Sequence, residues 1–418
     1  MHFGIVSPPV SGHIHPFAAL GRELIGRGHR VSFLQMADLA ERVQNEGLGF
    51  ITIGESDHPR GSLPESLAQL GRLQGLAALR FTISAIRKTT EMICRDAPAA
   101  VRRTGIDALL VDQTEPAGGS VAELLGIPFV TICNAMLMNS EPLIPPPFTG
   151  WRYRSGIWGR LRNSTGYAVH RRIMRPVTEI LDRYRAQWKL PTLRDPEDSF
   201  SKLAQISQQP AAFEFPRTRL PETFHYVGPL RNDSGPATPF PWHKLDGRPL
   251  IYASLGTLQN RKENMFRTFA EACAGLDAQL VITHGHGLAP EIAASFPGDP
   301  LIVGYAPQRA VLAKARLTLT HAGLNTTLDS LAAGVPLVAI PITYEQPAIA
   351  SRIAWTGTGR VVRLAGLAPD RLRTVIREAL ADEECRRKAL RMREAIASSG
   401  GVERAASLVG QVVCAAKC

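Results

Sequence analysis

The chain has 418 residues, of which 48 are Lys or Arg and 37 are Asp or Glu, so its formal net charge is +11. Hydrophobic residues make up 44% and charged residues 20%, a globular balance that excludes a disordered or low-complexity chain. This length predicts two or three domains with cores of their own. The positive charge leaves open an anionic partner such as a nucleotide, a nucleic acid or an acidic bilayer surface.

The cysteines and the first residues bear on the cellular compartment. The six cysteines are scattered without a C-x-x-C pair, which favours reduced thiols in a cytoplasmic protein over a disulfide framework or a zinc site. The N-terminus lacks a basic start, and Pro8 and Pro9 interrupt its apolar run, so we expect a first strand there and no signal peptide. No stretch approaches about 20 uninterrupted apolar residues, and we expect no membrane span.

The N-terminal half alternates between apolar runs and amphipathic stretches. The pattern predicts a strand at 3–7, a loop containing Gly and Pro at 8–15, and an amphipathic helix at 16–26. A strand at 31–35 completes a unit that is typical of a parallel, doubly wound sheet. Further strands are expected at 49–53, 108–111 and 129–133.

A second alternating series begins near Pro249. Its expected elements are strands at 250–254, 279–283, 301–304, 317–321 and 336–340, and helices at 264–275 and 323–334. The stretch 229–248 is rich in Gly, Pro, Ser and Asp, which favours an interdomain linker. We therefore predict an α/β protein with two facing Rossmann-like domains, at 1–228 and 249–418. The helices from Pro369 onward are expected on the surface, with the final one able to pack back on the N-terminal domain.

The segment from Gly304 to Gln346 carries the strongest chemical signal. A strand runs into H-A-G at 321–323, and a helix follows from about Asn325. Gly323 allows a ligand to approach the backbone, and Asn325 and Thr326 are expected to cap the helix. The free N–H groups of such a helix start suit a diphosphate without a metal ion.

Two further side chains of this segment suit a nucleotide. Asp329 lies one helical turn beyond the helix start, where its carboxylate can accept hydrogen bonds from a ribose diol. Tyr305, upstream, can stack on a nucleobase. The segment therefore predicts a site for a nucleoside diphosphate.

The same segment resembles the donor-binding signature of the UDP-glycosyltransferase superfamily, whose inverting members have the GT-B fold. S-L-G-T, at 254–257, resembles the family's loop that closes over the donor phosphate. The resemblance implies donor contacts from Ser254, Gly256, Thr257, Tyr305, Gln308, His321, Gly323, Asn325, Thr326, Asp329, Glu345 and Gln346. Leu324 stands where plant members commonly have Trp, and Asp329 where they have Glu, so plant members do not indicate the sugar.

In the N-terminal half, S-G-H-I-H-P at 11–16 resembles the family's G-H-x-x-P loop, which implies that His13 is the catalytic base. Asp112 matches the acidic partner of that histidine. An imidazole with a pKa of about 6.5 can take the proton of an attacking hydroxyl, while the carboxylate fixes its tautomer. The chain contains no D-x-D motif, consistent with a metal-independent reaction. We expect neither a metal nor a cofactor, because UDP-glucose is a co-substrate.

A second resemblance, to bacterial carotenoid glucosyltransferases of the zeaxanthin type, covers nearly the whole chain. It is carried by V-D-Q-T-E-P-A-G-G-S-V-A-E, L-A-Q-I-S-Q, Y-V-G-P-L-R, Y-A-S-L-G-T-L-Q and Q-P-A-I-A-S-R-I. It implies glucose transfer from UDP-glucose to the hydroxyls of zeaxanthin or a similar hydroxylated carotenoid. A transferase acting on a polyketide, macrolide or flavonoid remains an alternative, as do a non-catalytic pigment- or lipid-binding relative and a nucleotide-sugar epimerase.

Several other polar residues have a structural explanation that competes with a functional one. Glu115 either contacts the acceptor or His13, or simply caps the helix that starts near Pro116. His15 is expected to be a structural loop residue. His284 and His286 have no carboxylate or Cys nearby, and we assign them no metal.

The segment 142–178 contains seven arginines and no acidic residue, and aromatic and apolar residues interleave with them. Such a composition suits a membrane-surface element, which we place at 148–175, on the inner membrane face of a cytoplasmic protein. An ordinary solvated pair of helices covering the acceptor cleft explains the pattern equally well. Since no binding motif accompanies the charge, we expect no nucleic-acid partner.

Overall fold

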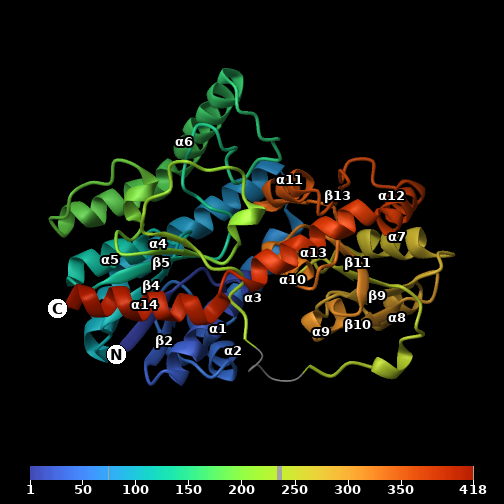
Figure 1. Ribbon diagram of the computed structural model, residues 1–418. Helices are drawn as coiled ribbons and strands as arrows, with labels where there is room; N and C mark the ends of the chain where they lie inside the picture. Colours follow the sequence, from blue (N-terminus) through green and yellow to red (C-terminus); the bar gives the residue numbers. More distant parts are fainter. Residues whose placement is uncertain (74, 233–237, 418) are drawn as a thin grey trace.

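The computed structural model describes residues 1–73, 75–232 and 238–417, and it places them in two halves, each built on a parallel sheet (Figure 1). Within these residues the first sheet has seven strands in the order β3-β2-β1-β4-β5-β6-β7. They are β1 (His2–Val6), β2 (Arg30–Gln35), β3 (Gly49–Thr52), β4 (Ala108–Asp112), β5 (Phe129–Cys133), β6 (Gln205–Ser207) and β7 (Phe224–Tyr226). The strand order reverses between β1 and β4, and in open α/β sheets ligands bind beyond the carboxyl ends of the strands at such a point.

The second sheet repeats this plan, with six described strands in the order β10-β9-β8-β11-β12-β13. They are β8 (Leu250–Ser254), β9 (Gln279–Thr283), β10 (Leu301–Val303), β11 (Ala315–Thr320), β12 (Leu337–Ala339) and β13 (Gly359–Val361). Its order reverses between β8 and β11. The predicted α/β class with two parallel sheets is confirmed.

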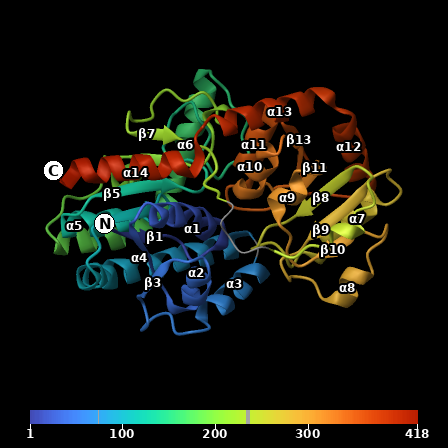
Figure 2. The same cartoon turned by 60° about the horizontal axis from the view of Figure 1, so that its bottom comes forward.

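Helices cover both faces of each sheet (Figures 1 and 2). Those of the N-terminal half are α1 (Ser11–Gly26), α2 (Ala40–Asn45), α3 (Ser62–Arg72), α4 (Gly75–Thr104), α5 (Ala117–Leu125) and α6 (Ile157–Gln187). Those that follow β8 are α7 (Glu263–Cys273), α8 (Pro290–Ala294), α9 (Gln308–Leu312), α10 (Leu324–Ala332), α11 (Gln346–Thr356), α12 (Pro369–Ala381), α13 (Glu383–Ala397) and α14 (Gly401–Lys417).

The first helix begins earlier than the sequence predicts. We expected a loop over 8–15, but α1 starts at Ser11, because the N–H groups of His13 and Ile14 both donate to the carbonyl of Val10. Pro16 therefore lies inside the helix, where it removes a single backbone donor without ending it. As a result His13 lies in the first turn of α1 and not in a flexible loop.

The C-terminal helices bury apolar side chains in the cores and are not confined to the surface, where we expected them. Leu372 and Ile376 of α12 lie in the core of the second sheet, while Met392 of α13 packs with the apolar face of α10 and α11. The last helix, α14, crosses back to the N-terminal half and lies along α1 (Figure 2). Its Val409 and Val413 are fully buried in the core beneath β1 and β4.

The polypeptide passes between the halves twice. The first passage joins β7 to β8 and includes the predicted linker 229–248, of which 233–237 lie outside the described residues. The second is the turn between α13 and α14, where the N–H of Gly401 donates to the carbonyl of Val227. Both sheets consequently face one cleft.

Candidate active site

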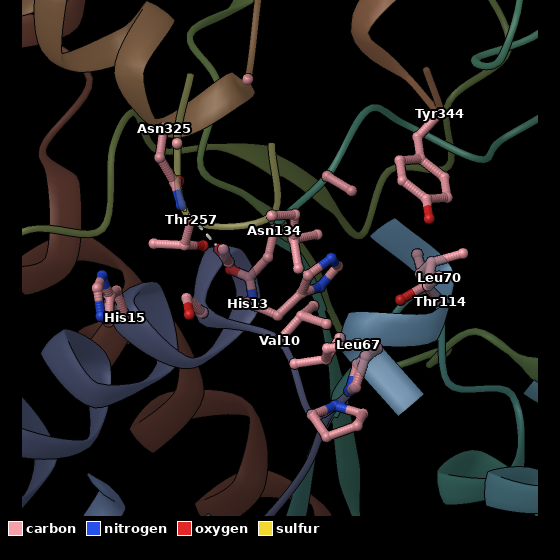
Figure 3. Close-up of a pocket in the computed structure, with 18 of the residues that line it drawn as sticks. Val10, His13, His15, Leu67, Leu70, Thr114, Asn134, Thr257, Asn325 and Tyr344 are labelled. Carbon is pink, nitrogen blue, oxygen red and sulfur yellow. Dashed lines mark hydrogen bonds between the residues drawn. The ribbon is translucent and has the colours of Figure 1, made fainter. Parts of the chain in front are cut away.

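A cleft of about 1080 Å³ lies between the two halves. The start of α1 and the end of β4 line it from the N-terminal half, and the residues after β8, β11 and β12 line it from the other. Figure 3 shows His13 near the centre of this space, with Asn325 and Thr257 of the C-terminal half above it. The predicted catalytic and donor residues from both halves therefore meet in one place.

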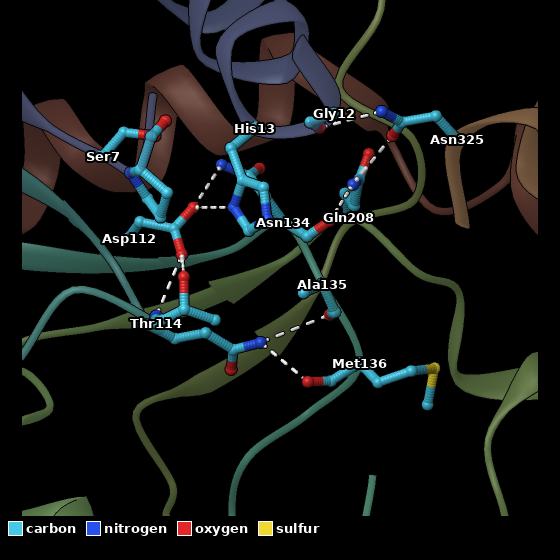
Figure 4. Close-up of polar contacts among 12 residues, drawn as sticks. Ser7, Gly12, His13, Asp112, Thr114, Asn134, Ala135, Met136, Gln208 and Asn325 are labelled. Atoms are coloured by element: carbon cyan, nitrogen blue, oxygen red, sulfur yellow. Dashed lines mark hydrogen bonds and ion pairs between the residues drawn. The ribbon is translucent and has the colours of Figure 1, made fainter. Parts of the chain in front are cut away.

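His13 and Asp112 form a direct pair (Figure 4). The imidazole Nδ1 lies 2.7 Å from Asp112 Oδ2, and the His13 side chain is 18% exposed while that of Asp112 is fully buried. The carboxylate also accepts hydrogen bonds from the backbone N–H and the hydroxyl of Thr114 and from the side-chain amide of Asn134. Asp112 is thus fixed by its own neighbours and in turn fixes the imidazole ring.

This pairing shifts the pKa of both groups. Burial alone lowers the pKa of His13, but the carboxylates of Asp112, Glu345 and Glu115 outweigh it, and the pKa ends above the ordinary histidine value. Burial alone raises the pKa of Asp112, but the imidazole and the Thr114 hydrogen bonds bring it below the ordinary value. The pair therefore favours a charged carboxylate beside an imidazole that binds protons readily.

Two more carboxyl groups border the pair. Burial, followed by the charge of Asp112, raises the pKa of Glu115 to about 8. The Oε1 atom of Glu115 is buried and has no hydrogen-bond partner among the described residues. Burial also raises the pKa of Glu345, although its Oε2 accepts a hydrogen bond of 2.7 Å from the backbone N–H of Met136, across the cleft. Glu345 thus links the halves as well as lining the predicted sugar site.

The donor wall is built around His321. Its ring packs so closely on the backbone that a Cβ placed on Gly323 or Gly256 would lie 2.6 or 2.8 Å from ring atoms, so these two positions need glycine. Gly256 also has a φ of +67°, which favours glycine. Burial lowers the pKa of His321 to about 4, so the ring is neutral near pH 7 and can donate a hydrogen bond but carries no charge.

The helix that follows His321 differs from the prediction at its start. Gly323 is the N-cap of α10, and no side chain caps the helix, so the expectation that Asn325 and Thr326 cap it is wrong. Both lie in the first turn, where the backbone N–H groups have no intrahelical partner and can meet an anion. The Asn325 side chain instead reaches the N-terminal half and donates to the carbonyl of Gly12 at 2.8 Å (Figure 4).

The carbonyl of Gly12 is available for this contact because of Pro16. In an α-helix the N–H of residue 16 would bond to the carbonyl of residue 12, and proline has no N–H. The proline in α1 thus leaves an acceptor at the cleft for the amide of Asn325.

Sequence reasoning missed Arg231, which enters the predicted ribose site. Its guanidinium donates to Asp329 at 3.0 Å and to Asn325 at 2.8 Å, and Gln208 accepts from it and also contacts Asn325. Gln308 completes this network by donating to the other oxygen of Asp329 at 2.7 Å. Arg231 ends the string Y-V-G-P-L-R, which was the one available signal, but nothing in that string indicates a contact almost a hundred residues away.

The remaining predicted donor residues also line the cleft. Tyr305 is half exposed, lines the cleft and forms a T-shaped ring pair with His286. Ser254 is buried at the end of β8, while Thr257 is exposed. Gln346 borders the cleft, and its side-chain oxygen accepts hydrogen bonds from the backbone N–H groups of Ile342 and Thr343 in the preceding loop.

An apolar wall extends the cleft beyond His13 on the N-terminal side. Leu63, Leu67 and Leu70 recur at helical spacing on α3 and line the cleft, together with Phe81 of α4. Figure 3 shows Leu67, Leu70 and Tyr344 on one side of His13 and His15 on the other. This wall was not predicted, although the leucine spacing on α3 was a usable signal.

The residues that we left without a functional role have local partners. His15 contacts Arg42 at 2.8 Å, and burial lowers its pKa to about 4. His284 accepts a hydrogen bond from the backbone N–H of Leu288.

No group of three or more His, Cys, Asp or Glu with metal-binding geometry occurs within the described residues. No described helix is both long enough and apolar enough to cross a bilayer.

Known protein families match both halves of this chain. A model of the glycosyltransferase family 28 N-terminal domain matches residues 11–133, and one of the erythromycin biosynthesis protein CIII-like C-terminal domain matches 267–409. Across 99% of its length the chain is 34% identical to a zeaxanthin glucosyltransferase of Pantoea ananas and 37% identical to one of Pseudescherichia vulneris, covering 96% and 98% of those proteins.

Solved structures share the arrangement of the two halves. The glycosyltransferase of kitacinnamycin superposes with a TM-score of 0.77 at 23% identity and covers 99% of both chains. The calicheamicin glycosyltransferase CalG4 superposes with a TM-score of 0.73 at 25% identity, covering 99% of this chain and 98% of that one.

Proposed function

The chain belongs to the UDP-glycosyltransferase superfamily and has its GT-B fold, and on that premise we propose that it transfers glucose from UDP-glucose to the hydroxyl groups of zeaxanthin or a similar hydroxylated carotenoid. Glycosyl transfer itself follows from the family. The acceptor rests on one observation, the identity to two zeaxanthin glucosyltransferases over nearly the full length of all three chains. The apolar wall along α3 and α4 supports it, because a carotenoid is an elongated hydrocarbon with hydroxyls at its ends.

In the proposed reaction, His13 is the general base. Since Nδ1 donates to Asp112, the neutral ring carries its lone pair on Nε2. As the acceptor oxygen attacks the anomeric carbon of glucose, its proton passes to Nε2 and the bond from that carbon to the UDP oxygen breaks. One displacement of this kind inverts the anomeric configuration. Asp112 stabilises the imidazolium that forms.

The leaving UDP gains negative charge near the start of α10. The free N–H groups of Asn325 and Thr326 and the neutral ring of His321 are placed to donate to it. Asp329, Gln308 and Tyr305 serve the nucleoside, and Glu345 serves the sugar. No step of this scheme requires a metal or a cofactor.

The direct test is incubation with UDP-glucose and zeaxanthin in detergent, followed by measurement of the product mass. We expect zeaxanthin to gain one or two hexosyl units, with UDP released in equal number. Parallel reactions with soluble polyketide, macrolide and flavonoid acceptors separate the alternative. Turnover of those acceptors without any turnover of zeaxanthin would overturn the proposed acceptor and leave the transferase assignment standing.

A further inference from the structure

The two faces of the N-terminal part of α6 differ in what covers them. One face is buried: Asn163 donates to the carbonyl of Pro142, Tyr167 is almost fully covered, and His170 stacks on Phe148 at 4.5 Å. Phe148 and His170 also line the cleft. This inner face therefore belongs to the wall of the acceptor space.

The described residues leave the opposite face exposed. Ile157 and Trp158 are each 76% exposed and Leu161 is 59% exposed, and Val169 continues the same side of the helix two to three turns further on. Figure 1 shows the beginning of α6 projecting beyond the body of the molecule. Large apolar side chains are seldom left at the tip of a projecting helix without a surface to receive them.

The charges around this face have a single sign. Six exposed arginines accompany it, namely Arg152, Arg154, Arg160, Arg171, Arg172 and Arg175. No acidic residue occurs between 142 and 178, and the one acidic partner among the ion pairs of these six is Glu179, which pairs with Arg175 in the described structure. The alternative of a pair of helices in this segment is wrong, because α6 is continuous from Ile157 to Gln187 despite Pro176.

We propose that the outer face of α6, formed by Ile157, Trp158, Leu161 and Val169 with the surrounding arginines, docks on an anionic lipid bilayer. A projecting helix with an apolar face, a tryptophan and flanking arginines has the properties of an interfacial helix. The arginines meet the lipid phosphates while the apolar side chains enter the boundary between headgroups and acyl chains. The purpose of docking rests on the proposed function, since an apolar acceptor dissolved in the bilayer then reaches the cleft along the inner face of the same helix.

The test is co-sedimentation of the full chain with vesicles, without donor or acceptor, so that its outcome does not depend on glucosyl transfer. We expect binding to equimolar phosphatidylcholine and phosphatidylglycerol, and much weaker binding to phosphatidylcholine alone. The variant I157S/W158S/L161S is expected to lose at least about tenfold in partition coefficient. The variant R160Q/R171Q is expected to lose about fivefold per arginine at low salt, and less at high salt.

Control variants carry the same two kinds of substitution, apolar to Ser and Arg to Gln, on exposed residues of the C-terminal half. V361S/L364S and R371Q/R377Q are expected to bind vesicles as the wild type does, because these exposed residues belong to β13, α12 and the turn between them and not to α6. Turnover of UDP-glucose with zeaxanthin in detergent micelles shows that the α6 variants are folded. If that turnover is absent for the wild type, the proposed function fails and vesicle binding still tests the surface.

Two results would overturn the proposal. One is wild-type binding to anionic vesicles that the α6 variants retain in full. The other is a wild-type chain that ignores vesicles but self-associates in sedimentation velocity, with self-association lost in I157S/W158S/L161S, which would make this face an interface between two copies.

Discussion

The two halves of the cleft present the same local architecture with opposite chemistry. In each sheet the strand order reverses, and a helix begins just beyond the reversal, α1 in the N-terminal half and α10 in the other. The start of α1 is surrounded by the carboxyl groups of Asp112, Glu115 and Glu345, while the start of α10 lies beside the neutral ring of His321 and the guanidinium of Arg231.

This difference shows that the fold places a helix start at the cleft in each half, while the neighbouring charged groups decide the chemistry of that helix start. Carboxylates beside α1 raise the proton affinity of a histidine, which suits a base. Near the first turn of α10, Arg231 and Gln308 already engage the carboxylate of Asp329, which leaves the N–H groups of that turn for an anion. A substitution on one side of the cleft therefore leaves the other side as an internal control.

The largest effect is expected from removing the base. His13→Ala should lower kcat by about 10²–10⁴, because the hydroxyl proton loses its acceptor. UDP affinity, measured by calorimetry, should stay within about twofold, since His13 lies on the opposite side of the cleft from α10. His15→Ala is the matched control in the same helix and should retain most activity. Full activity of His13→Ala would remove His13 from the mechanism.

Replacing the partner carboxylate should move the pH profile as well as the rate. The base must be neutral, so kcat/KM rises as pH increases through the pKa of His13, which lies above the ordinary value. In Asp112→Asn the main charge that raises this pKa is gone while burial still lowers it, so the rising limb should shift to lower pH. The maximal rate should fall by about 10²–10⁴ because the tautomer is no longer held. A rate loss without any shift of the limb would contradict the pairing.

On the other side of the contrast, Arg231→Gln should weaken the donor site. Arg231 holds Asp329 and Asn325 in the donor site by hydrogen bonds. A hydrogen bond to a charged group contributes about 1.5–3 kcal/mol, and if this loss falls on the donor site, UDP should bind roughly 10–100-fold more weakly. The effect should fall on the KM for UDP-glucose and not on the pH limb of His13. Arg316→Gln, at a surface pair with Glu383, is the control and should change neither. Unchanged or tighter UDP binding would mean that Arg231 does not support the donor site and only occupies the carboxylate of Asp329, in competition with the ribose.

The smallest effect is expected from Glu115→Gln, which imitates the protonated carboxyl. Its pKa of about 8 means that the folded protein keeps the proton over a range where the unfolded chain releases it. Wild-type stability is therefore lost progressively as pH rises from the ordinary carboxyl range to about 8, and the glutamine variant escapes this loss. The difference in Tm should grow with pH, by about 2–4 °C for each kcal/mol. Equal Tm differences at all pH values would show that Glu115 is ionised throughout.

Much of this organisation could be predicted from short stretches of sequence. The alternation of apolar strands and amphipathic helices predicted both sheets apart from the short strands β6, β7 and β13, and the G-H and H-A-G motifs placed His13 and His321 beside the strand ends. The helix start at Ser11 was missed because the Gly and Pro content of 8–15 favoured a loop, whereas the turn before Pro16 is bonded to Val10 and the helix tolerates the one missing donor.

The sequence alone, through short motifs and the family resemblance they carry, indicated which residues are candidates for the base, for its acidic partner and for the donor ligands, because each motif is local in the chain. Only the tertiary structure decided which of them meet across the cleft: Asn325 with Gly12, Arg231 with Asp329, Glu345 with Met136, and α14 with α1. The physical reason is that periodicity and motif spacing report short-range geometry. Contacts between the halves depend on how two separately packed cores are oriented, and no repeat in the sequence encodes that orientation.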